Sequence, residues 1–195
     1  MKKSFIYIAA IIGSLAILSC SRTVQRVDTK QQIDLSGRWN DTDSRLAAEE
    51  LITEVLEGHW LPNFQNDNNG KKPVVIAGIV YNKSHEHIEA ETFIKDIEKS
   101  FIRSQKVRLV QGGQKREEVR AERADQQTNS SNSTMKKWGL EIGADYMLQG
   151  DINSIVDAHK KEKVVYYQIN LELTHLQTNE IVWIGDKKIK KLVKR

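Results

Sequence analysis

The histidines are the first side chains to consider for metal chemistry. The chain has five of them, His59, His85, His87, His159 and His175. A zinc site needs ligands about one helical turn apart on a rigid element, together with a third ligand. Only His85 and His87 lie near each other, in a turn expected after residue 84. We interpret both as exposed loop histidines, with adventitious metal binding as the alternative, and expect neither a metal nor a cofactor.

One serine and lysine pair has the spacing of a nucleophilic site. Ser133 and Lys136 match the S-x-x-K pattern of penicillin-recognising enzymes, in which the serine attacks and a nearby lysine assists. The companion S-D-N and K-T-G elements are missing, and Ser133 is better placed as the cap of a helix. No Walker A or G-x-G-x-x-G phosphate-binding pattern occurs either. We therefore expect a binding protein rather than an enzyme, with no small-molecule substrate.

The composition indicates a globular domain. Of the 195 residues, 39% are hydrophobic, 29% are charged and only two are proline. These values exclude collagenous, disordered and multi-span membrane chains. The formal net charge of +4 arises from 30 basic and 26 acidic residues that are mixed along the chain, so we expect no nucleic-acid partner.

The N-terminus has the layout of a secretory signal. Lys2 and Lys3 precede an apolar stretch over residues 5–18, which is short for a membrane span of about 20 residues. The stretch ends in Ile17-Leu18-Ser19-Cys20, which resembles the bacterial lipobox, and Cys20 is the only cysteine. We predict that residues 1–19 are a lipoprotein signal peptide and that Cys20 carries diacylglycerol and an amide-linked fatty acid such as palmitate. The alternative is an ordinary secretory signal with an incidental cysteine.

The mature chain is expected to divide into a tether and one domain. Residues 20–33 are polar and without periodicity, which predicts a lipidated N-terminus and flexible tether, and residues 34–195 are expected to fold. Ser21 and Arg22 follow the cysteine in place of the aspartate that often retains lipoproteins at the inner membrane, so the outer membrane is favoured.

Hydrophobic periodicity predicts the elements of the domain. Helices are expected over residues 43–57, 88–103 and 134–142, with a solvated helix over 114–127. Strands are expected over residues 74–80, 106–110, 146–156, 164–175 and 181–189. The order predicts an α+β fold, a single domain whose mixed sheet ends in a three-stranded antiparallel meander. Helices should pack on the sheet face that carries Tyr167, Ile169 and Leu171.

Two further segments have alternative interpretations. Residues 59–64 place Trp60 and Phe64 in a loop after a helix, and such aromatics either cover the core or form a recognition loop. Six basic residues crowd the end of the chain, Lys187, Lys188, Lys190, Lys191, Lys194 and Arg195. They either protect an edge strand that leads into a frayed terminus, which we favour, or attract an acidic partner.

Two stretches resemble a known family. Residues 143–150 read Gly-Ala-Asp-Tyr-Met-Leu-Gln-Gly, and residues 176–185 read Leu-Gln-Thr-Asn-Glu-Ile-Val-Trp-Ile-Gly. Together with the lipobox they resemble the LpoB family of outer-membrane lipoproteins, which activate bifunctional penicillin-binding proteins. The start of the domain at residues 34–41 also resembles relatives of that family. Similar domains occur at the N-terminus of TolB and in the curli secretion lipoprotein, so these motifs specify a fold more closely than a partner.

The resemblance implies a lipid-anchored regulator on the periplasmic face of the outer membrane. It would bind and activate a peptidoglycan synthase, a bifunctional penicillin-binding protein, and so regulate cell-wall synthesis and cell shape. The alternative is an envelope assembly or scaffold lipoprotein with the same fold and no synthase partner. The tether departs from the better-known activators, whose tethers are long and rich in proline, since residues 20–33 contain no proline. The resemblance assigns no contact residues.

Overall fold

The computed structural model describes residues 23–131, 133 and 141–194. The chain divides into two units, Met1–Gln31 and Gln32–Arg195. In the first unit, residues 23–31 contain neither helix nor strand. All helices and strands described below belong to the second unit.

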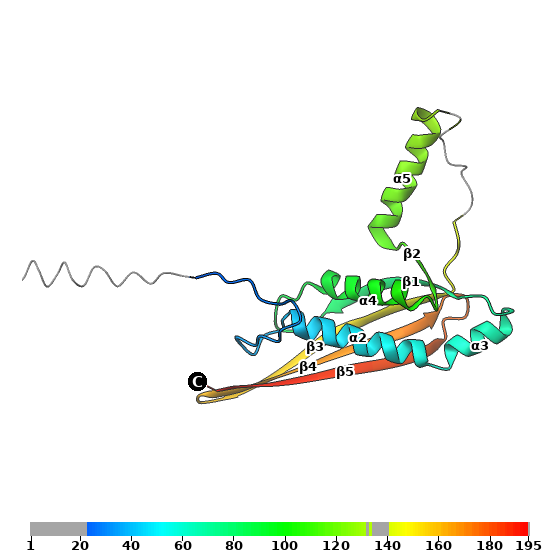
Figure 1. The fold of residues 1–195 in the computed structure, drawn as a ribbon. Helices are drawn as coiled ribbons and strands as arrows, with labels where there is room; N and C mark the ends of the chain where they lie inside the picture. The colour runs from blue at the N-terminus through cyan, green and yellow to red at the C-terminus, as the bar shows by residue number, and fades with distance from the viewer. Residues whose placement is uncertain (1–22, 132, 134–140, 195) are drawn as a thin grey trace, which may run out of the picture. The chain divides into compact units, whose positions relative to one another are not determined.

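The second unit is built on one mixed sheet of five strands in the order β2-β1-β3-β4-β5. The strands are β1 Val74–Asn82, β2 Arg108–Val110, β3 Tyr146–His159, β4 Glu162–His175 and β5 Ile181–Lys194. Strand β1 pairs in parallel with β2 and with β3, whereas β3, β4 and β5 pair antiparallel. Helix α4 connects the parallel strands β1 and β2, and the pairing of β3, β4 and β5 confirms the expected meander (Figure 1).

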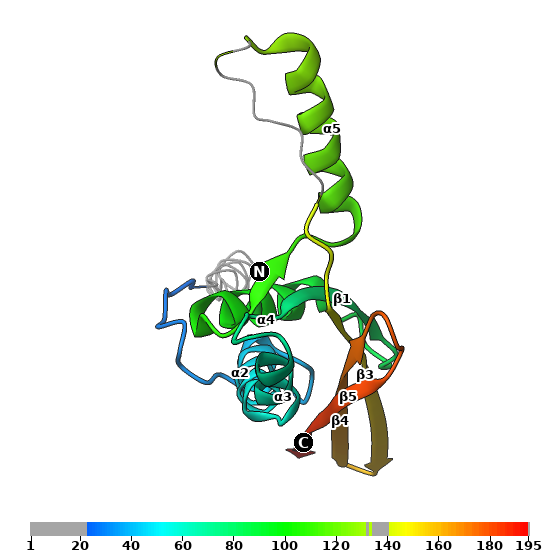
Figure 2. The same cartoon turned by 90° about the vertical axis from the view of Figure 1, so that its right-hand side faces the viewer.

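Helices cover one face of this sheet. They are α2 Asp41–Glu57, α3 Trp60–Asp67 and α4 Ala90–Ser104, whereas a further helix, α5 Gly113–Asn129, stands apart from this layer (Figure 1). Helix α2 contacts β4 and β5, and α4 contacts β1 and β2. Figure 2 shows α2, α3 and α4 on the same side of the strands. The predicted α+β class with a mixed sheet is therefore confirmed.

The core lies between this helical layer and the sheet. Alternate residues of β4 point into it, and Tyr167, Ile169 and Leu171 are fully buried, as their alternation predicts. Helix α4 contributes Phe93 and Phe101, which are also fully buried. Burying such side chains contributes about 25 cal/mol for each Å² of apolar surface removed from water. The three strands of the meander and the helices α2 and α4 therefore share one continuous core.

The chain between the first helix and the first strand is helical, which corrects the prediction of a loop. Helix α3 spans Trp60–Asp67 and contains Pro62 in its first turn, where a missing N–H leaves no helical hydrogen bond broken. The indole Nε1 of Trp60 donates to the Val55 carbonyl at 2.6 Å. Trp60 and Leu61 are buried, so the interpretation in which these side chains cover the core is confirmed.

Several predicted boundaries differ from the structure. Strand β5 continues to Lys194 and pairs there with Glu162, so the predicted fraying of the terminus is wrong for the described residues. Strand β1 is only partly buried, since Ile79 is 60% exposed. Helix α5 has no buried residue, which confirms the prediction of a solvated helix. Most of the helix predicted over 134–142 lies outside the described residues.

Candidate functional site

The sheet face opposite the helices is the candidate site, and we call it the outer face. Because side chains alternate along β4, the buried set at 165–173 leaves Tyr166, Gln168 and Asn170 on the other side. The register places Asp151 of β3 opposite Asn170, so it shares this face. Asn153, opposite Gln168, lies there as well. Among the described elements no helix covers these residues.

The polar side chains of the outer face form a connected row. Tyr166 Oη donates to Gln168 Oε1 at 3.1 Å, and Gln168 Nε2 donates to Asn170 Oδ1 at 2.8 Å. Asn170 Nδ2 then donates to Asp151 Oδ1 at 2.9 Å, and Asn153 Nδ2 donates to the same oxygen. Because each side chain is held by its neighbour, the row presents donors and acceptors in fixed positions.

The row ends in a charged carboxylate. Burial by itself raises the pKa of Asp151, but hydrogen bonds from Asn170 and Lys83 outweigh it and hold the pKa below its usual value. Lys83 Nζ lies 3.1 Å from Asp151 Oδ2. Asp151 is therefore ionised at neutral pH and paired. The row suits recognition, because its side chains are hydrogen-bonded to one another and its carboxylate is paired with Lys83.

Large apolar side chains flank the polar row. Ile155 lies opposite Tyr166, Tyr81 opposite Asp151 and Ile184 opposite Glu172, and all three are exposed. Fixed polar groups among exposed apolar side chains are the composition of protein-binding surfaces. The arrangement can dock another protein, and within the described residues it holds no group of three or more side chains that could bind a metal ion.

Comparison with known proteins decides the family. A profile described as peptidoglycan-synthase activator LpoB matches residues 43–189, which include all four described helices except the first two residues of α2, and nearly the whole sheet. The chain belongs to the LpoB family. The family is one of activators of peptidoglycan synthases, as the resemblance implied. A search of curated proteins finds no match.

Several solved structures are similar to the chain. The LpoB C-terminal domain from Salmonella enterica has 18% identity and a TM-score of 0.44, covering 76% of this chain and 99% of that one. The corresponding domain from Escherichia coli has 16% identity and a TM-score of 0.47, with 76% and 99% covered. Lipoprotein GNA1162 from Neisseria meningitidis has 10% identity and a TM-score of 0.38, with 62% and 83% covered.

The histidine pair lies at one end of β1 in this LpoB-family domain. His85 Nδ1 lies 2.6 Å from Ser154 Oγ, and the His85 ring stacks on Tyr167 with centroids 6.4 Å apart. His87 Nε2 lies 2.7 Å from Glu89 Oε1. Each ring thus has its own partner, and the two do not form a common site. The position of His85 in a predicted turn did not indicate that its ring would stack on the buried Tyr167.

The structure describes only some of the other candidate residues. Ser133 Oγ lies 3.2 Å from Ser131 Oγ, whereas Lys136 lies outside the described residues, so the S-x-x-K pair is not tested. Cys20, the predicted lipid-attachment residue, also lies outside them. In the part of the chain that the structure describes, none of the helices is both long and apolar enough to cross a membrane.

The terminal lysines lie on an edge strand, as the favoured interpretation predicts, and several are paired. Lys191 Nζ lies 2.6 Å from Asp43 Oδ2 and 2.9 Å from Asp34 Oδ1. Burial by itself lowers the pKa of Lys191, but the two carboxylates outweigh it and raise the pKa. This ion pair network joins the start of the domain to its last strand. Sequence reasoning missed it because Asp34 and Lys191 lie at opposite ends of the domain.

Acid should remove the contribution of Asp34 to stability. Its pKa is lowered from 3.8 to about 2, first by the hydrogen bond from Gln32 and then by those from Lys191 and Asn40. A depressed pKa stabilises the fold above the unfolded value of 3.8, and that contribution is lost as pH falls toward about 2. Asp34→Asn should therefore lower the thermal midpoint at neutral pH and match the wild type near pH 2. A difference that stays constant with pH contradicts this assignment.

Proposed function

We propose that this protein is a lipoprotein of the outer membrane that binds a peptidoglycan synthase, a bifunctional penicillin-binding protein, and activates it from the periplasmic face. The observation that carries the proposal is the match of the LpoB family over residues 43–189. The outer face supports it by offering a preorganised surface for another protein. The protein contributes no catalytic group of its own in this proposal.

Activation requires that the domain bind one state of the synthase more tightly than another. A ligand shifts a conformational equilibrium only by its difference in affinity for the two states. The fixed row from Tyr166 to Asp151 suits this role, because polar groups already held in position lose little freedom when a partner docks. The synthase state that matches the row is the one in which glycan polymerisation and cross-linking are faster.

The lipid anchor confines the domain near the membrane. Attachment through three acyl chains at Cys20 is durable, since two chains already hold a protein stably to a bilayer. The residues between Cys20 and Asp34 span about 45 Å when fully extended. The proposal therefore requires a synthase whose regulatory module extends toward the outer membrane, or an envelope that is narrow.

Reconstitution tests the proposed function. The purified, lipidated full chain is added to a purified bifunctional synthase from the same envelope in liposomes, and glycan polymerisation is measured. We expect stimulation, and we expect Tyr166→Ala to weaken it by about tenfold through the loss of an aromatic contact at the surface. Ile102→Ala is the matched control, because Ile102 is exposed on α4, away from the outer face.

Two results together would overturn the proposal. They are unchanged glycan synthesis in the reconstituted system and the absence of any synthase among proteins crosslinked to the chain in cells. Both results would favour the alternative of an envelope assembly or scaffold lipoprotein.

A further inference from the structure

Strand β1 has an open edge. Its pairing with β2 covers only Val74–Ile76, although β1 continues to Asn82. From Ala77 onward the only strand beside it among the described residues is β3. A strand edge without a neighbour presents N–H and C=O groups that another strand can pair with. We call the segment from Ala77 to Tyr81 the β1 edge.

The turn after β2 keeps this edge open. The chain leaves the sheet at Gly112 and Gly113, and Gly113 adopts a φ of 55° that favours glycine. A Cβ on Gly112 would lie 3.0 Å from the Ile76 side chain and 3.3 Å from the Ala77 carbonyl oxygen. The backbone thus passes close over the end of the β1–β2 pairing and continues into α5. Strand β2 ends there, and the Ala77 carbonyl faces the open side.

The two edges of the sheet differ in charge. At the opposite edge, β5 carries lysines at 187, 188, 190, 191 and 194, which oppose the addition of another strand. The β1 edge reads Ala-Gly-Ile-Val-Tyr and carries no charge and no proline. Proteins usually protect exposed edges with charge, proline or a bulge. The β1 edge has an irregularity between Ala77 and Val80, but that shift lies in its pairing with β3.

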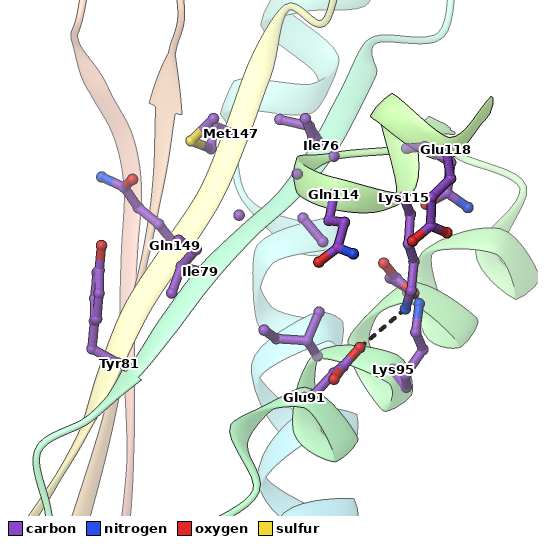
Figure 3. Close-up of a pocket in the computed structure, with 17 residues that line it drawn as sticks. Ile76, Ile79, Tyr81, Glu91, Lys95, Gln114, Lys115, Glu118, Met147 and Gln149 are labelled. Carbon is purple, nitrogen blue, oxygen red and sulfur yellow. Dashed lines mark hydrogen bonds and ion pairs between the residues drawn. The ribbon is translucent and has the colours of Figure 1, made fainter. Parts of the chain in front are cut away.

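A groove of about 560 Å³ runs along the β1 edge. Figure 3 shows its walls, with Ile79 and Met147 from the sheet on one side and charged side chains of α4 and α5 on the other. Lys115 Nζ pairs with Glu91 Oε1 at 3.1 Å across the far wall. The volume lies within the range of about 300–1,000 Å³ that is typical of ligand sites.

The charges of the groove favour a basic occupant. Its two lysines are already paired, Lys115 with Glu91 and Lys95 with Glu98. Glu118 also lines the groove, and within the described residues its carboxylate has no ion pair. The lining therefore carries one uncompensated negative charge beside apolar surface from Ile79 and Ile94.

We propose that the β1 edge binds an extended polypeptide segment of a partner protein, which adds a strand to the sheet beyond the end of β2. Apolar side chains of the segment contact Ile79 and Ile94, and a basic side chain pairs with Glu118. Main-chain hydrogen bonds supply affinity in such strand addition, and alternate side chains supply specificity. The inference goes beyond the proposed function, because it does not require that the partner be a synthase.

Amide hydrogen exchange on the purified, lipidated full chain in detergent micelles tests the proposal. The probe is a capped synthetic peptide of alternating valine and threonine with one central lysine. We expect saturating peptide to slow exchange within the β1 edge by at least about tenfold, because new main-chain hydrogen bonds form there. Exchange along β5 should not change.

Variants distinguish binding of the peptide at the β1 edge from nonspecific adsorption to the protein. Ile79→Lys should weaken peptide binding by at least about tenfold, because a lysine on an edge opposes strand addition. Ile102→Lys is the matched control, since Ile102 on α4 is 59% exposed and Ile79 is 60% exposed, and it should bind the peptide as the wild type does. Glu118→Gln should weaken binding about threefold and reduce its dependence on salt.

Three outcomes would overturn the proposal. They are unchanged exchange at the β1 edge under saturating peptide, protection confined to β5, and self-association of the chain that Ile79→Lys abolishes while the peptide fails to bind. The last outcome assigns the edge to a second copy of this chain. None of them bears on the synthase assay, so failure of this proposal and failure of the proposed function are distinguishable.

Discussion

Replacing Cys20 by serine is expected to release the mature protein from membranes. Serine has no thiol to accept diacylglycerol, so all acyl chains that follow from that step are lost as well. Each buried CH₂ of an acyl chain contributes about 0.8 kcal/mol to membrane binding. Loss of the chains should therefore change the ratio of bound to free protein by more than about a hundredfold. Membrane fractionation measures this ratio, and mass spectrometry of the N-terminal peptide measures the lipid.

The control for this prediction is a change that keeps the thiol. Ser19→Ala retains a small residue before Cys20, so acylation and membrane binding should persist. An unacylated N-terminus in the wild-type protein contradicts the lipobox interpretation. The same holds if Cys20→Ser remains membrane-bound after its signal peptide has been removed, since the anchor would then lie elsewhere.

Substituting alanine for Gly150 is expected to destabilise the domain by about 3 kcal/mol, at the upper end of overpacking effects. A Cβ at this position would lie 2.0 Å from the carbonyl oxygen of Asn170 and 2.8 Å from Leu171 Cδ2. The carbonyl belongs to the backbone of β4, so relief of the clash requires that two paired strands in the middle of the sheet separate. Urea denaturation followed by circular dichroism measures the free energy of unfolding.

Gly143→Ala provides the matched control for the Gly150 prediction. Among the described residues no atom lies within 4 Å of a Cβ on Gly143, so the stability of Gly143→Ala should stay within about 0.5 kcal/mol of the wild type. Equal stability of Gly150→Ala and the wild type would show that β3 and β4 do not approach as closely at Gly150 as the structure indicates.

The local elements of this protein could be predicted because burial imposes a period on the sequence. The stripe that predicts α2 and the alternation from Tyr167 to Leu173 each repeat with the geometry of their own element. Helix α3 was missed because Pro62 is read as a loop residue, and only its place in the first turn permits a helix.

The prediction of lipid attachment at Cys20 rests on the sequence alone, because a processing signal is recognised along an extended chain and needs no fold. The residues that form the surface sites are brought together only by the tertiary structure. The outer-face row joins Asp151 to Asn170, and the ion pair network joins Asp34 to Lys191. The β1 edge exists because β2 ends after Val110 while β1 continues. Each of these features depends on which distant segments pair and in what register. A local period of polar and apolar residues predicts which face of an element is buried, but it does not predict which other element packs or pairs there.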